Sequence, residues 1–201
     1  MRTALDILVF PDAEVLDVMG PYEAFSLATH DAGGEAFDVR LVAHNATSDR
    51  VVALRNGLRV VADRTIDTRA TDASVGDGIL LVPGGPGVRR LLDDAALHRW
   101  IGVRAREAQL VLSVCTGAWL LGLARLLDGV PATTHHQGFD DLARIAPTCD
   151  VRRGARFVDA GRIKTSAGVS AGIDLSLHVI AERLGAAARD RVTTTMEWPH
   201  D

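Results

Sequence analysis

Residues 110–124, LVLSVCTGAWLLGLA, contain the pattern that decides the fold. An apolar stretch of strand length (110–114) runs directly into a helical pattern, and Cys115 stands between the two. Small residues on either side, Ser113 and Gly117, allow the sharp strand-to-helix turn of a nucleophile elbow, with cysteine in place of the serine of G-x-S-x-G. The pattern predicts that this turn lifts Cys115 out of the sheet.

The helix after the elbow is expected to start near Thr116, so that its N-terminus lies against the Cys115 sulfur. Unpaired N–H groups and the helix dipole favour a thiolate there, which predicts a pKa below the ordinary ~8.5 of a thiol. The alternative is that Cys115 is only a small buried residue of the core. A buried cysteine needs neither small neighbours nor a helix start, so the pattern favours a reactive role.

Length and composition indicate one α/β domain spanning residues 1–201. The chain has 47% hydrophobic and 24% charged residues, as an ordinary soluble globular protein does. A net charge of -4 provides no basic patch, so nucleic acid is not an expected partner. The two cysteines, Cys115 and Cys149, do not make a disulfide framework and indicate a reduced, cytoplasmic protein. The apolar run in the N-terminal MRTALDILVF is too short for a membrane helix, and no cleavage site follows it.

Strands and helices alternate along the chain. Buried strands are predicted at 4–10, 37–43 and 78–82, short strands within 149–165, and helices at 93–108, 116–124, 138–145, 172–184 and 186–196. A helical pattern also follows the first strand, and Pro21 is expected to divide it into a short turn and a longer helix.

Asn56-Gly57 lies between two β-branched runs and predicts a β-hairpin over residues 50–66. The fold class that follows is α/β. We expect a single doubly wound, mostly parallel sheet of the flavodoxin-like type, with helices on both faces and the hairpin as an excursion.

In such a sheet, ligands bind outside the carboxyl ends of the parallel strands. This rule brings together the elbow, the loop after the first strand, and PGGPG (83–87) after the strand at 78–82. Gly84 and Gly85 would let backbone N–H groups approach a developing negative charge, as an oxyanion hole requires. A tight turn without a ligand explains the motif equally well. No Lys-Ser/Thr follows, so a phosphate-binding P-loop is rejected.

An acid partner for Cys115 is expected in the loop after the first strand. Asp12 and Glu14 flank the predicted turn and are expected to be solvated. Asp17 lies between Leu16 and Val18, so of the three carboxyls it is the one expected to be partly buried. Burial raises the pKa of a carboxyl, which can then hold a proton near neutral pH. A helix-capping aspartate is the alternative.

Other polar residues carry weaker signals. His178 and Glu182 have the i, i+4 spacing of a helical metal pair, but the sequence shows no third ligand, and no metal site is expected. His135 and His136 are adjacent, so their side chains are expected to diverge, and one of them could face the site. Cys149 has no elbow and is expected to be inert.

Five stretches together resemble one known family. They are FPDAEVLDVMGPYEAF, LVPGGPG, SVCTGAWLLGLARLLDG, PATTHH and TSAGVSAGIDLSLHVIAERLG. The combination, which extends from about residue 4 to 196, resembles the ThiJ/PfpI superfamily of the class I glutamine amidotransferase-like fold. Within it, the chain is most similar to the branch that contains isonitrile hydratases and the sensor domains of AraC-type regulators. The histidine at position 136 departs from the aromatic residue usual in that family.

The resemblance implies a site and a reaction. Cys115 would be the nucleophile, Asp17 its hydrogen-bonded acid and base, and Thr116 a supporting neighbour, with Gly84, Gly85 and His135 as substrate contacts. The reaction would be hydration of an isonitrile to an N-substituted formamide through a Cys115 thioimidate, without metal or organic cofactor. The partners would be a small-molecule substrate and, as is common in this family, a second copy in a homodimer.

Three other functions are compared with the hydratase. Peptidases and amidotransferases of this fold need a histidine base, and residue 116 is Thr. Stress-response members that handle glyoxal or sense oxidants typically carry glutamate where this chain has Asp17. Sensing domains of regulators are followed by a helix-turn-helix region, for which a chain ending at Asp201 leaves no room. The hydratase is therefore favoured, with a cysteine-based stress-response role or a non-catalytic sensing domain as alternatives.

Overall fold

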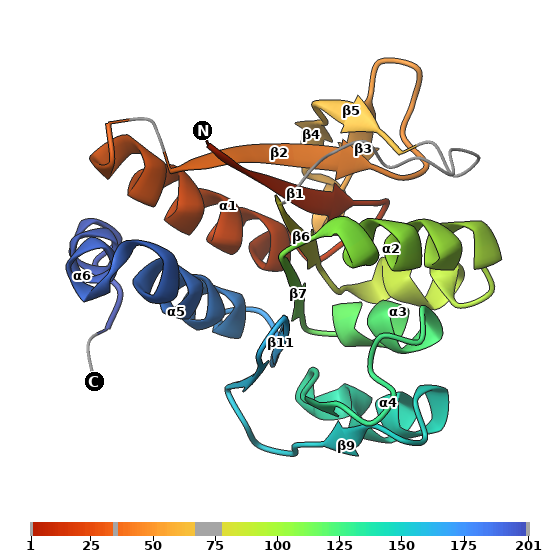
Figure 1. Cartoon of the computed structure of the whole chain (residues 1–201). Helices are drawn as coiled ribbons and strands as arrows, with labels where there is room; N and C mark the ends of the chain where they lie inside the picture. Colours follow the sequence, from red (N-terminus) through yellow and green to blue (C-terminus); the bar gives the residue numbers. More distant parts are fainter. Residues whose placement is uncertain (1, 34–35, 67–77, 200–201) are drawn as a thin grey trace.

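A seven-stranded sheet forms the centre of the molecule (Figure 1). The computed structural model describes residues 2–33, 36–66 and 78–199. Its central strands are Thr3–Val9 (β1), Phe37–Ala43 (β2), Arg64–Thr65 (β5), Gly78–Val82 (β6), Leu110–Val114 (β7), Phe157–Ala160 (β10) and Ile163–Ser166 (β11).

The strands follow the order β10-β11-β7-β6-β1-β2-β5. Neighbours pair in parallel, except that β10 is antiparallel to β11. Read from β2 to β11, this is the 2-1-3-4-5 order of flavodoxin-like sheets. The predicted fold class is confirmed.

Helices cover both faces of the sheet, as predicted. They are Val15–Asp31 (α1), Ala95–Glu107 (α2), Gly117–Leu123 (α3), Phe139–Ile145 (α4), Ala171–Leu184 (α5) and Ala186–Thr195 (α6), with short 3-10 turns at Arg55–Gly57, Pro86–Leu91 and His136–Gly138. Figure 1 shows α1, α5 and α6 on one side of the sheet and α2 and α3 on the other. None of the helices in the described parts of the chain is both long and apolar enough to cross a membrane.

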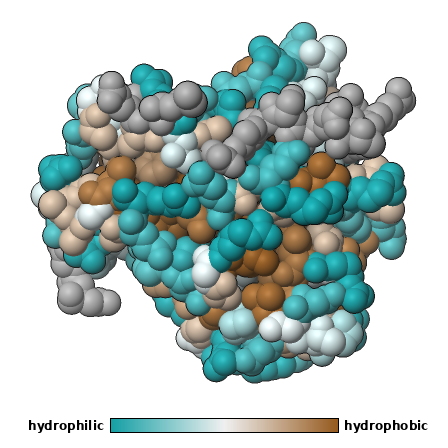
Figure 2. Space-filling model, in the orientation of Figure 1, coloured by the Kyte–Doolittle hydropathy of each residue, from teal (hydrophilic) through white to brown (hydrophobic). Residues whose placement is uncertain are grey.

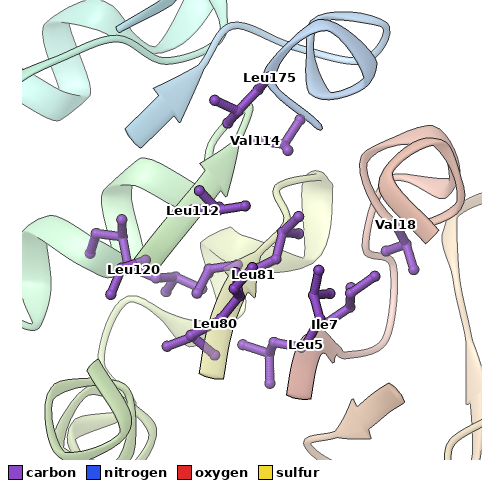
Figure 3. Close-up of a cluster of buried hydrophobic side chains, with 14 of the residues drawn as sticks. Leu5, Ile7, Val18, Leu80, Leu81, Leu112, Val114, Leu120 and Leu175 are labelled. Atoms are coloured by element: carbon purple, nitrogen blue, oxygen red, sulfur yellow. The ribbon is translucent and has the colours of Figure 1, made fainter. Parts of the chain in front are cut away.

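The core lies between the sheet and these helices (Figure 3). Strands β6 and β7 are buried along their whole length, which is why their sequences are continuous apolar runs rather than alternating ones. The residues labelled in Figure 3 come from both layers: Leu5, Ile7, Leu80, Leu81, Leu112 and Val114 from the sheet, and Val18, Leu120 and Leu175 from the helices. Hydrophilic residues cover much of the face shown in Figure 2.

Pro21 lies inside α1 and does not divide it, so that prediction is wrong. A proline inside a helix costs about 3 kcal/mol, because it removes a backbone hydrogen bond and its ring crowds the preceding turn. Close packing of α1 against α5 offsets this cost. A Cβ at Gly20 would lie 2.9 Å from Ile173 Cγ1, and one at Gly172 would lie 3.5 Å from Pro21 Cγ. These small residues let the two helices approach along an unbroken α1.

The hairpin is confirmed. Strands Val51–Ala53 (β3) and Arg59–Val61 (β4) pair antiparallel, and the loop between them holds Asn56 at φ 60° and Gly57 at φ 84°. The pair forms a small sheet of its own, as does the parallel pair Pro131–Ala132 (β8) and Asp150–Val151 (β9).

Candidate active site

The elbow at Cys115 has the geometry that the sequence predicts. Cys115 directly follows β7 and has φ 59°, a left-handed backbone conformation that residues with side chains rarely adopt. A Cβ at Gly117 would lie 2.1 Å from the Val82 carbonyl oxygen, so only glycine fits where the turn passes the end of β6. Cys115 is 6% exposed, at the carboxyl ends of the parallel strands.

Asp17 meets the elbow from the first turn of α1. Its side chain is fully buried, and its carboxylate accepts hydrogen bonds from the N–H groups of Gly84 (3.0 Å) and Val169 (3.1 Å). The Cys115 thiol lies beside it, and each of the two groups shifts the pKa of the other. Glu14 occupies the N-cap position of α1, so the helix-capping alternative for Asp17 is wrong. Asp17 thus connects α1 with the segments that carry Gly84, Cys115 and Val169.

Burial raises the pKa of Asp17 to about 7, and the charge of Glu14 adds to the effect. The hydrogen bonds from Gly84 and Val169 act in the opposite direction but are weaker than the loss of solvation. A carboxyl with this pKa takes up and releases a proton near neutral pH, as general acid–base chemistry requires.

The pKa of the Cys115 thiol is raised, which contradicts the lowered value expected from the helix N-terminus. Burial is the largest cause, and the negative charge of Asp17 is the next. Hydrogen bonds with the backbone and side chain of Thr116 favour the thiolate but are outweighed. The thiol therefore keeps its proton at neutral pH.

The predicted oxyanion hole at Gly84 and Gly85 is wrong, because both N–H groups already have partners. Gly84 donates to Asp17, and Gly85 donates to the Thr116 hydroxyl at 3.0 Å. Close approach is nevertheless the reason for glycine here. A Cβ at Gly84 would lie 2.4 Å from the Thr116 nitrogen, and Gly85 has φ 120°. The two glycines fix Asp17 and Thr116.

Cys115 opens into a cavity of about 230 Å³. Of the predicted substrate contacts, Gly85 and His135 lie on its walls and Gly84 does not; Thr116, predicted as a supporting neighbour of Cys115, also lies there. The walls also include residues that the sequence analysis did not place there: Glu14, Arg55, Arg89, Trp119, Gln137 and Val169.

Glu14 is not solvated as expected. Its side chain is 14% exposed and forms an ion pair with Arg55, which comes from the loop of the β3–β4 hairpin. The two residues are 41 positions apart, so no local pattern indicates the contact. Asp12, in contrast, is half exposed and pairs with Arg90.

His135 faces the cavity, and its neighbour His136 is exposed. The rings do not diverge as predicted, because their centroids are 4.2 Å apart. A Cβ at Gly168 would lie 2.2 Å from His135 Cδ2, so the imidazole packs directly on that glycine. Burial, followed by the nearby His136, lowers the pKa of His135 and favours the neutral ring.

A third potential metal ligand, Asp159, joins His178 and Glu182, and their ligand atoms lie within 4.8 Å of one another. The sequence pattern missed it because Asp159 belongs to β10. The buried Lys164 ammonium, however, forms ion pairs with both carboxylates. It supplies the positive charge that a cation would bring. These residues do not line the cavity at Cys115.

Comparisons with known proteins show which family this chain belongs to. The sequence profile of the DJ-1/PfpI family matches residues 4–182. The isonitrile hydratase of Pseudomonas putida is 33% identical over 199 residues, which are 98% of this chain and 79% of the relative. The HTH-type transcriptional regulator GbdR of Pseudomonas aeruginosa is 25% identical over 90% of this chain, which spans 47% of the regulator. A crystal structure of a ThiJ/PfpI family protein from Pseudomonas syringae matches this chain with a TM-score of 0.84 and 28% sequence identity. The match covers 100% of this chain and 77% of the Pseudomonas syringae chain.

Proposed function

Since this chain belongs to the DJ-1/PfpI family, we propose that it is an isonitrile hydratase, which adds water to an isonitrile and releases an N-substituted formamide. The observation that carries the proposal is the pairing of the Cys115 thiol with the buried Asp17 carboxyl, each of which shifts the pKa of the other. A nucleophile that opens into a cavity stands beside a buried carboxyl with a pKa of about 7, and the reaction needs both groups.

The first step forms a carbon–sulfur bond. An isonitrile R–N≡C is electrophilic at its terminal carbon, and the Cys115 sulfur attacks there. Asp17 accepts the thiol proton and delivers it to the same carbon, giving the thioimidate Cys–S–CH=N–R. Because the pKa of the thiol is raised, the sulfur still carries its proton when the isonitrile binds, and Asp17 has to accept that proton during the attack.

The second step consumes water. Asp17 removes a proton from the water that adds to the thioimidate carbon and passes this proton to the nitrogen. The carbon–sulfur bond then breaks, the thiol recovers its proton, and the formamide R–NH–CHO leaves. The overall reaction combines one isonitrile with one water molecule, so a nucleophile and an acid–base group are sufficient for it. Thr116 and Gly85 would hold the elbow, and His135 would contact the substrate from the wall.

The alternatives have less support. Cysteines that sense oxidants have low pKa values and good solvent access, whereas Cys115 has a raised pKa and is 6% exposed. The likeness to a transcriptional regulator keeps a non-catalytic sensing domain as the second candidate.

Turnover of cyclohexyl isocyanide to its formamide, followed by chromatography, tests the proposal. The wild type should form product, Cys115→Ala should form none, and Asp17→Asn should lose about 10² to 10⁴ in kcat/KM. Cys149→Ala is the matched control and should retain full activity, because this thiol lies outside the cavity. If the wild type forms no product while Cys115 still reacts with iodoacetamide, the hydratase proposal fails and the sensing or stress-response role takes its place.

The homodimer stays a prediction. Leu58 (46% exposed) and Val61 (64% exposed) on the hairpin are the apolar side chains that a partner copy would cover. A molecular mass measured by sedimentation would decide between monomer and dimer.

A further inference from the structure

Arg89 differs from two nearby arginines, Arg55 on the same cavity wall and Arg90, its neighbour in the sequence, which does not line the cavity. Arg55 has an ion pair with Glu14, and the neighbouring Arg90 has one with Asp12. Within residues 2–33, 36–66 and 78–199, no carboxylate lies within 4.0 Å of the Arg89 guanidinium. Its positive charge is therefore not balanced by this part of the chain, although it belongs to the wall of the cavity that holds Cys115.

The exposed side chain of Arg89 lies over an aromatic ring rather than beside a carboxylate. It comes from the 3-10 turn Pro86–Leu91, and its Cζ lies 5.3 Å from the centroid of the Trp119 ring. Trp119 is itself fixed, since it is 2% exposed and donates a hydrogen bond to the Gly138 carbonyl at 3.2 Å. A guanidinium over an aromatic face still presents its N–H donors at the edge, where they can bind a carboxylate through two hydrogen bonds.

We propose, on the basis of the hydratase function, that the substrate is a small isonitrile carrying a carboxylate, and that Arg89 binds this carboxylate. The isonitrile carbon then lies at Cys115 and the anionic group at Arg89, within one cavity of about 230 Å³. Glu14 and Arg55 cancel each other's charge, so Arg89 is the unpaired cation among the described residues of the cavity wall and favours an anionic group beside it. A neutral isonitrile would provide no anionic group for the Arg89 guanidinium, whose N–H donors would then be hydrated.

Alkylation of Cys115 tests the charge preference without any turnover. Iodoacetate and iodoacetamide react with thiols in the same way and differ in their negative charge. In a Cys149→Ala background, the ratio of the iodoacetate rate to the iodoacetamide rate should fall about tenfold in Arg89→Met, equivalent to the loss of one favourable charge contact. Arg90→Met is the matched control, because its guanidinium is paired with Asp12, and its ratio should equal that of the parent. An unchanged ratio in Arg89→Met overturns the proposal.

Turnover separates this proposal from the hydratase function itself. Isocyanoacetate and its neutral methyl ester differ only in the anionic group. The wild type should prefer isocyanoacetate in kcat/KM, and Arg89→Met should remove the preference while it retains activity on the ester. Equal kcat/KM values for acid and ester in the wild type overturn the carboxylate proposal and leave the hydratase function intact. Loss of the preference only in Arg90→Met would likewise overturn the role of Arg89.

Discussion

Cys115 and Val169 both hold positive φ values, 59° and 57°, that side-chain-bearing residues rarely adopt. Asp17 contacts both, through the Cys115 thiol and the Val169 N–H. A buried carboxyl therefore holds two strained backbone positions where the reaction is proposed to occur. The same burial gives Asp17 its raised pKa, so the residue that fixes the geometry also carries the proton.

Asp17 should make the stability of the protein depend on pH. Its pKa is about 7 in the folded state and 3.8 in the unfolded chain. Between these values the native state binds a proton that the unfolded state has released, so the stabilisation is complete below the lower pKa and is lost as the pH rises through the higher one. The free energy of unfolding, measured with urea between about pH 5 and 8, should fall by up to about 1.4 kcal/mol per pH unit relative to Asp17→Asn. A constant difference between the two proteins would contradict a protonated, buried Asp17.

Residues with a local signal could be predicted from the sequence, and residues without one could not. The small neighbours of Cys115 and the apolar neighbours of Asp17 mark these two positions. Arg55 and Arg89 line the cavity from a hairpin loop and a 3-10 turn. The sequences of these two segments do not predict that they lie near Cys115. The direction of the thiol pKa was wrong for the same reason: the helix N-terminus is visible in the sequence, whereas the burial that outweighs it is not.

At the scale of elements, hydrophobic runs and turn residues predicted the alternation of strands and helices, and hence the sheet edge at which the site lies. The prediction failed at Pro21, because packing against α5 decides whether α1 continues through it. Asn56-Gly57 correctly marked the hairpin. The hairpin also places Arg55 beside Glu14, and the turn residues do not predict this long-range contact.

The same substitution, glycine to alanine, should change the free energy of unfolding in opposite directions in the hairpin loop and in α2. Gly57 has φ 84° with no atom within 4 Å of a Cβ, so Gly57→Ala adds only backbone strain and should lower the free energy of unfolding by about 1 kcal/mol. Gly102 lies inside α2, where a Cβ would make an ordinary contact at 3.9 Å with the Ala124 carbonyl oxygen. Gly102→Ala should therefore raise the free energy of unfolding by up to about 1 kcal/mol. Urea unfolding measures both, and equal shifts of the same sign would contradict the two backbone assignments.

At the scale of the whole molecule, Asp6 joins four elements through one buried carboxylate. It lies in β1, is fully buried, and forms ion pairs with Arg40 of β2 (2.9 Å), Arg64 of β5 (2.6 Å) and Arg104 of α2 (3.1 Å). This polar cluster explains the single acidic residue in the first strand, which otherwise reads as a continuous apolar run. Three elements far apart in the sequence thus depend on one charge.

Removal of that charge should cost far more than removal of an equivalent charge at the surface. In Asp6→Asn, the Arg104 guanidinium, 1% exposed, keeps its charge without a carboxylate, and breaking a buried ion pair in this way costs about 3 to 5 kcal/mol. Asp140→Asn is the matched control, because Asp140 (87% exposed) pairs with Arg153 (58% exposed), and an exposed pair contributes about 0 to 1 kcal/mol. Urea unfolding near neutral pH compares the two variants. Similar losses in both would mean that the cluster around Asp6 is solvated and does not hold β1, β2, β5 and α2 together, whereas a loss confined to Asp6→Asn would identify this carboxylate as the link between the sheet and α2.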